Sequence, residues 1–422
     1  VGDEAGTAIT TGDSNTAMGR SALVANTTGG SNTAVGDNSL AANTTAANNV
    51  AVGGYALSTN TTGTANVAVG KIALRFNTTA SNNTAIGYSA LYANTTGDNN
   101  VAVGYGSLVA NTTGSANAAV GLSCLDSNTT GNHNNALGYL ALQANTTGSQ
   151  NTAIGGTALY ANTTASDNTA VGYTALTSNT TGGNLVAVGK GALESNTTAN
   201  NSVAVGLRAL NANTTGADNT AMGRDALYVN TTGANNVALG AFALDANTTA
   251  SNNTAVGHNS LGASTTGGGS NTCIGYTSGR YITTGQDNVF VGMNTGSYQQ
   301  PLITGNGNVL IGPYTDTTSA VEDYAHGLGY NINCAAGYVT FGLGGSDIRA
   351  AHGNVTWSTV SDERYKKNIT TSTAGLSVIN ALRPVTWNYK TLGELPTTFN
   401  AYKADSTEVF KNTQTNHGFI AQ

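Results

Sequence analysis

The chain has 422 residues, of which only 9% are charged, and its formal net charge is −6. This balance supplies no basic surface for a nucleic acid, and no run of about 18 apolar residues predicts a membrane span. The three cysteines lie far apart, which argues against a disulfide framework. Cys124 takes a position that other repeats fill with Ala or Ser, so we expect a small buried side chain there.

A 17-residue unit repeats from the beginning of the chain. Its consensus is Asn-Thr-Ala-Val-Gly-x-x-Ala-Leu-x-x-Asn-Thr-Thr-Gly-x-x, and its marker glycine recurs every 17 residues from Gly2 to Gly257. A fixed period of this length is typical of solenoids and fibres. Disorder is the other interpretation of low-complexity sequence, but the Val and Leu positions never lose their register. Residues 1–276 are therefore predicted to form an all-β, parallel β-solenoid (a β-roll) with 17-residue coils.

Each unit is expected to supply two short strands and two turns. The strands would be Asn-Thr-Ala-Val-Gly and Ala-Leu-x-x-Asn-Thr-Thr, because each is followed by small polar residues or glycine. The first 300 residues contain no proline, as a fully paired parallel ladder requires. We expect the Val-type residue and the Leu to fill the coil, and the Asn and Thr columns to stack as ladders. Asn-Thr-Thr is also formally an N-glycosylation acceptor.

The alanine two residues before each marker glycine suggests an assembly surface. It is present in all fifteen units from Gly19 to Gly257. In a strand it points away from the neighbouring Val-type residue, and it is never replaced by a larger side chain. We therefore expect another chain to approach closely at this column, and a homotrimer to result.

The repeat changes after residue 276. Gly279 and Gly296 replace the Leu of the unit, and Ile282 replaces the Asn, which suggests that interior volume lost at one site is regained nearby. Residues 277–315 are predicted to be irregular terminal coils, and residues 316–357 a β-rich neck. The neck contains His326 and His352, but nothing nearby in the sequence completes a metal site, so neither a metal nor another cofactor is expected.

The charge rises sharply from about residue 358, and a helix is predicted to begin near Ser372. Three blocks follow one another in this region: Ser361–Ile369 (Ser-Asp-x-Arg-x-Lys-x-Asn-Ile), Leu382–Val385 (Leu-Arg-Pro-Val) and Gly418–Gln422 (Gly-Phe-Ile-Ala-Gln). In this order they resemble the self-cleaving intramolecular chaperone domain of endosialidases and other phage tail fibres. The resemblance implies that residues 358–422 are the first part of a small α+β chaperone domain, which trimerises the fibre and then cuts itself off.

The same resemblance assigns the cleavage chemistry. The cut would fall between Val360 and Ser361, and Lys366 would assist the serine. A serine activated by a lysine base requires that lysine to be neutral and partly buried. The alternative is a charged, solvated junction that does not cleave.

We interpret the chain as a structural and adhesive fibre segment, and in particular as part of a phage tail fibre. It would lie outside the cell on the virion and present a surface for a host receptor, either a glycan or an outer-surface protein. The repeats are also similar to the head repeats of trimeric autotransporter adhesins, so a bacterial cell-surface adhesin or extracellular filament subunit is the alternative. A glycan-degrading enzyme would need paired carboxylates in a cleft, whereas Asp and Glu here are scattered over variable positions. Both ends of the sequence resemble the ends of a fragment.

Overall fold

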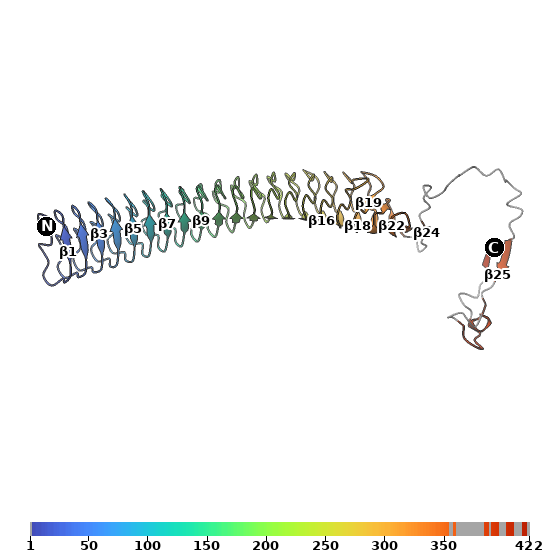
Figure 1. Cartoon of the computed structure of the whole chain (residues 1–422), viewed down its shortest axis with the longest axis horizontal. Helices are drawn as coiled ribbons and strands as arrows, with labels where there is room; N and C mark the ends of the chain where they lie inside the picture. Colours follow the sequence, from blue (N-terminus) through green and yellow to red (C-terminus); the bar gives the residue numbers. More distant parts are fainter. Residues whose placement is uncertain are drawn as a thin grey trace. The chain divides into compact units, whose positions relative to one another are not determined.

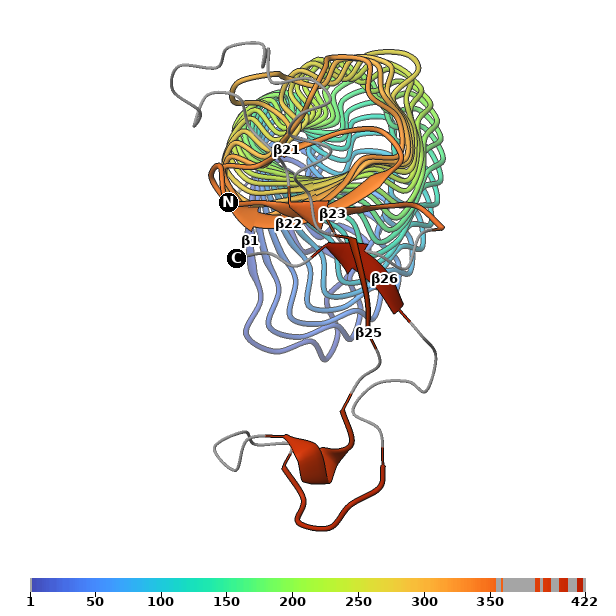
Figure 2. The same ribbon diagram turned by 90° about the vertical axis from the view of Figure 1, so that its right-hand side faces the viewer.

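The computed structural model describes residues 2–353, 358–359, 384–387, 390–395, 402–408 and 416–419. The chain divides into two compact units, Val1–Val360 and Ser361–Gln422. The first unit is a parallel β-solenoid whose coils lie side by side, with their strands along one side of the stack (Figures 1 and 2). The predicted fold class, an all-β solenoid with 17-residue coils, is confirmed. No helix in these described ranges is long and apolar enough to cross a membrane.

Each regular coil contributes one three-residue strand to a continuous sheet. Every strand pairs in parallel with that of the next coil, and equivalent residues face each other, as in Ala34 opposite Ala51. The strands are β1 (Thr16–Met18), β2 (Thr33–Val35), β3 (Val50–Val52), β4 (Val67–Val69), β5 (Thr84–Ile86), β6 (Val101–Val103), β7 (Ala118–Val120), β8 (Asn135–Leu137), β9 (Thr152–Ile154), β10 (Thr169–Val171), β11 (Val186–Val188), β12 (Val203–Val205), β13 (Thr220–Met222), β14 (Val237–Leu239), β15 (Thr254–Val256), β16 (Thr272–Ile274), β17 (Val289–Val291) and β18 (Val309–Ile311).

The second strand expected in each coil is absent from the described coils. The segment after the marker glycine is a series of turns, because two of its residues have left-handed backbone angles, as shown by Ser123 (φ 47°) and Leu125 (φ 52°). The backbone still bonds from coil to coil. The Leu125 N–H donates to the Ala141 carbonyl at 3.0 Å, and the Thr129 N–H to the Thr146 carbonyl at 2.9 Å. These turns therefore satisfy their peptide groups without being extended.

The core of a coil consists of two alanines and one leucine. In one coil these are Ala153, Ala158 and Leu159, all fully buried. The expectation that the Val-type residue fills the coil is wrong, since its side chain points outward; Ile154, for example, is 40% exposed. The expectation that the alanine column meets another chain is wrong for the same reason. Alanine is small at this position because it lies inside a narrow coil and packs against that coil's own leucine column.

Two buried asparagine columns run along the interior, as the predicted ladders require. In the first column, the Asn128 side-chain amide donates to Asn111 Oδ1 at 2.8 Å and to the Gly131 carbonyl at 3.1 Å. In the second, Asn134 Oδ1 accepts the backbone N–H of Asn151 at 3.1 Å. These amides therefore pair with one another and with turn peptides that water does not reach.

The first threonine of each Asn-Thr-Thr forms a third ladder. Its hydroxyl donates to the carbonyl of the equivalent threonine in the next coil, as Thr129 does to Thr146 at 3.0 Å. The prediction of stacked Asn and Thr columns is confirmed.

The predicted exchange of interior volume near the end of the array is also confirmed. Gly279 and Gly296 have φ values of 60° and 66°, and both stand where other coils carry leucine. A Cβ added to Gly279 would lie 3.2 Å from Ile282 Cδ1, and one added to Gly296 would lie 2.3 Å from Phe290 Cε2. Ile282 and Phe290 are fully buried and occupy the space that leucine leaves.

The parallel sheet continues beyond β18 through β20 (His326–Tyr330) and β22 (Tyr338–Leu343). It then ends in two antiparallel strands, β23 (Ile348–Ala351) and β24 (Ser358–Thr359). Beside it, β19 (Asp316–Thr317) pairs in parallel with β21 (Asn333–Cys334).

In the second unit, β25 (Pro384–Trp387) pairs antiparallel with β26 (Asn416–Phe419), and Leu392–Glu394 form a 3₁₀ helix, η2. The helix predicted near Ser372 lies outside the described residues.

Candidate functional site

The side of the sheet that points away from the coil interior carries a continuous column of apolar side chains. We call it the outward strand face; it comprises the residues one and three positions before each marker glycine in β1–β18, β20 and β22. The residue one position before is apolar in all twenty strands: Met18, Val35, Val52, Val69, Ile86, Val103, Val120, Leu137, Ile154, Val171, Val188, Val205, Met222, Leu239, Val256, Ile274, Val291, Ile311, Leu328 and Phe341. Several are half exposed, such as Met18 (54%) and Leu137 (50%).

The second column of the outward strand face, three positions before the marker glycine, is Thr or Val in most coils. The exceptions are Ala118, Asn135 and His326. Neither column contains Asp, Glu, Lys or Arg, although the positions after the glycine carry charges such as Arg20 and Lys71. The face is therefore an uncharged strip of mainly β-branched side chains.

Aromatic side chains gather beside this strip, directly after the marker glycine. Tyr88 and Tyr105 are stacked with ring centroids 5.4 Å apart, and His258 and Tyr276 are stacked at 5.5 Å. Because equivalent positions of neighbouring coils are adjacent, an aromatic residue at this position in two successive coils produces a stacked pair.

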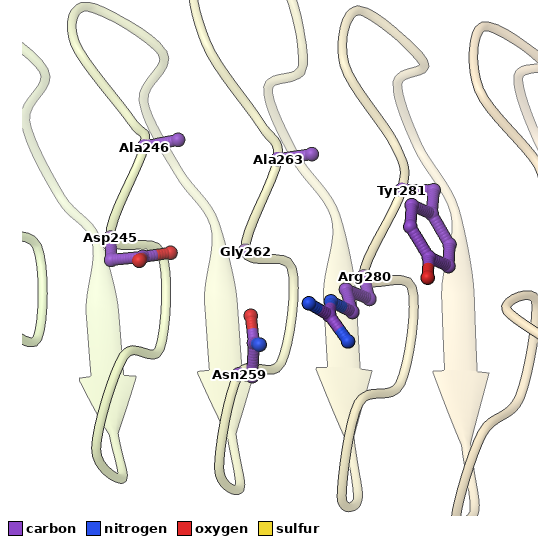
Figure 3. Close-up of a pocket in the computed structure, with 7 residues that line it drawn as sticks. All are labelled: Asp245, Ala246, Asn259, Gly262, Ala263, Arg280 and Tyr281. Carbon is purple, nitrogen blue, oxygen red and sulfur yellow. The ribbon is translucent and has the colours of Figure 1, made fainter.

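A groove lies on the turn side of the coils near the end of the regular array. Gly262 stands where the neighbouring coils carry Asp245 and Arg280, and it leaves a space of about 360 Å³. Asp245, Asn259 and Arg280 point toward this space, and Tyr281 lies beside Arg280 (Figure 3). Sequence reasoning missed this groove, although glycine at a position that normally carries a side chain was the available signal.

The groove combines groups that bind polyhydroxylated molecules. The Arg280 guanidinium lies 5.4 Å from the centroid of the exposed Tyr281 ring. The Asp245 carboxyl is half-buried, and this burial raises its pKa. A carboxylate, an amide and a guanidinium offer both acceptors and donors to hydroxyl groups, and a tyrosine ring offers a flat apolar surface.

Asp316 fixes the long coil that ends the regular array. Its carboxylate is fully buried and accepts the backbone N–H groups of Tyr298 (3.2 Å), Gln299 (2.5 Å) and Gln300 (3.4 Å). Burial raises the pKa of this carboxyl, and the three peptide donors oppose that effect. The residue is structural, because its acceptor atoms hold the insertion loop.

The predicted cleavage residues, Ser361 and Lys366, lie outside the described residues, as does Val360. Their roles therefore stay a prediction. The neck histidines are described: the rings of His326 and His352 lie 4.7 Å apart. Within the described ranges, no three His, Cys, Asp or Glu side chains come together as metal ligands would.

The comparison with known families concerns the second compact unit. Residues 361–422 match the family model described as chaperone of endosialidase. This match supports the predicted chaperone domain, and it begins at the serine proposed to follow the cut. No curated protein matches the chain. A β-solenoid followed by a segment similar to endosialidase chaperones fits a fibre-like structural protein.

Proposed function

We propose that this chain is a segment of a homotrimeric phage tail fibre, assembled by its C-terminal chaperone segment and placed outside the cell on the virion. One observation carries the proposal: an elongated solenoid precedes, in the same chain, a segment similar to endosialidase chaperones. A stack of coils held by repeated ladders supplies length and stiffness. The C-terminal segment brings the chains together. The only reaction that we propose is a single cut in the chain's own backbone, at the start of this segment.

The assembly is tested by the mass of the folded, full-length product in solution. Light scattering should give three chain masses, each chain being 42.2 kDa, or three masses of the shortened chain after cleavage. A monomer mass for the folded protein would contradict the proposed trimer. Electron micrographs of the same sample should show thin fibres, and compact particles would contradict the fibre.

The adhesive part of the proposal places a host glycan in the groove around Gly262. We expect Tyr281→Ala to weaken binding of the purified fibre on a glycan array by roughly tenfold, because an aromatic anchor at an interface contributes more than about 1 kcal/mol. Tyr139→Ala is the matched control, since Tyr139 is exposed and does not line the groove. Equal binding by wild type and Tyr281→Ala would show that the receptor binds elsewhere.

A further inference from the structure

We propose that the outward strand face is the surface on which copies of this chain meet, around an axis that runs along the fibre. This inference rests on the proposed trimer and specifies which side of the solenoid makes it. The outward strand face takes the place of the alanine column as the candidate interface, because the alanines lie inside the coil.

The outward strand face is long and uncharged, and one of its two columns is apolar in every strand. Twenty paired strands at ~4.8 Å per strand give a strip roughly 90 Å long. Its two outward columns, one apolar and one mainly Thr or Val, make it about 10 Å wide. Soluble monomers rarely expose a continuous apolar patch above a few hundred Å². The area of the strip is comparable to the ~800 Å² per partner that a stable protein interface buries. Its size therefore fits a permanent partner that runs along the whole stack.

The spacing of the outward side chains favours a second copy of this chain as the partner. The outward side chains form ridges that repeat once per coil, from Met18 to Phe341. A partner that packs against all of these ridges must carry ridges with the same spacing over the same length. A second copy of this chain, parallel and in the same register, meets this requirement. Val, Ile and Thr are stiff at χ1, so little side-chain entropy is lost when such ridges pack.

The distribution of charged side chains is compatible with identical chains meeting at the outward strand face. Around a rotation axis, each residue near the axis faces its own copies. Columns such as the one that contains Arg20, Lys71 and Lys190 would then bring like charges together in every chain. The outward strand face contains no Asp, Glu, Lys or Arg from β1 to β22, so three identical chains can share it without repulsion.

Replacing an alanine of the strand cannot test this surface. Ala153→Leu would overpack the coil's own core, so a loss of stability would say nothing about a neighbouring chain. The informative substitutions are those at outward residues.

The test uses single cysteines in the full-length chain and a short bis-maleimide cross-linker. Val188→Cys lies on the outward strand face, and Thr198→Cys lies on the exposed turn side of the same coil. The native cysteines are buried, so they should not react in the folded protein. We expect Val188→Cys to give covalently linked chains on a denaturing gel and Thr198→Cys to remain uncross-linked.

A second pair of variants tests the same face without cross-linking. Val188→Lys with Val205→Lys should abolish the trimer mass while the circular dichroism remains that of a β-protein, because both side chains point away from the coil interior. Thr198→Lys with Thr215→Lys should leave the trimer intact.

The outcomes separate two conclusions. A monomeric wild type would overturn the proposed trimer itself. A trimeric wild type in which Val188→Cys does not cross-link, or in which the lysine pair on the outward strand face leaves the trimer mass unchanged, overturns only this choice of surface.

Discussion

The marker glycine of each coil is required by its backbone angle and by the closeness of the next coil. Gly172 has φ 136°, and a Cβ added to it would lie 2.6 Å from the Gly189 carbonyl oxygen. Gly156, in the preceding coil, has no such restriction, because the nearest atom to an added Cβ is Tyr173 Cδ2 at 3.4 Å. The two glycines are one residue type in two different environments, and they form a matched pair for mutation.

We expect Gly172→Ala to lower the free energy of unfolding by about 2 kcal/mol or more, since backbone strain costs about 1–3 kcal/mol and the backbone contact adds to it. Gly156→Ala should change it by less than about 0.5 kcal/mol. Denaturant unfolding followed by circular dichroism measures both. Similar losses for the two variants would contradict this explanation of the repeat.

The leucine of each coil was predicted to lie in a second strand, but it lies in a turn. Its φ lies near +50°, as in Leu142 (53°), although left-handed angles are typical of glycine and asparagine. Full burial of a leucine contributes about 1.5–3 kcal/mol, which offsets a backbone cost of roughly 1–2 kcal/mol. The sequence contained one sign of this left-handed angle, because glycine replaces the leucine in three coils. These glycines, Gly6, Gly279 and Gly296, all have positive φ.

At the level of the coil, alternation alone could not decide which side of the strand is inside. It places Ala and the Val-type residue on opposite faces, and greater hydrophobicity favours the Val-type residue for the interior. The coil is too narrow for that choice, since two alanines and a leucine already fill it. The period, the parallel register and the Asn and Thr ladders were predictable because stacked coils repeat each side chain directly over its equivalent.

The end of the first asparagine ladder shows how a stack departs from its repeat. Ser264 replaces the asparagine that would follow Asn247, and its hydroxyl bonds to the Gly268 carbonyl instead. Asn247 Oδ1 is consequently buried without a hydrogen-bond partner, and the next coil carries the apolar Ile282. The polar ladder thus gives way to an apolar interior. Gly262 and its groove occur in this same irregular coil.

At the scale of the whole molecule, the boundary between the two compact units coincides with the proposed cleavage site. The first unit ends at Val360, and both the second unit and the family match begin at Ser361. A cut at this bond would release the chaperone segment and leave the solenoid intact. Assembly should come before the cut, because an isolated chain has no reason to hold the serine beside an uncharged lysine.

We predict that the chain assembles and is then hydrolysed between Val360 and Ser361. Ser361→Ala removes the hydroxyl and Lys366→Ala removes the base that activates it, so each variant should remain an uncut trimer. Lys367→Ala is the matched control, and it should be cut normally because the assigned base is its neighbour. Mass spectrometry of the wild-type fibre should find Val360 as the last residue. A different terminus, or a Ser361→Ala variant cut at the same bond, would show that this serine does not perform the reaction.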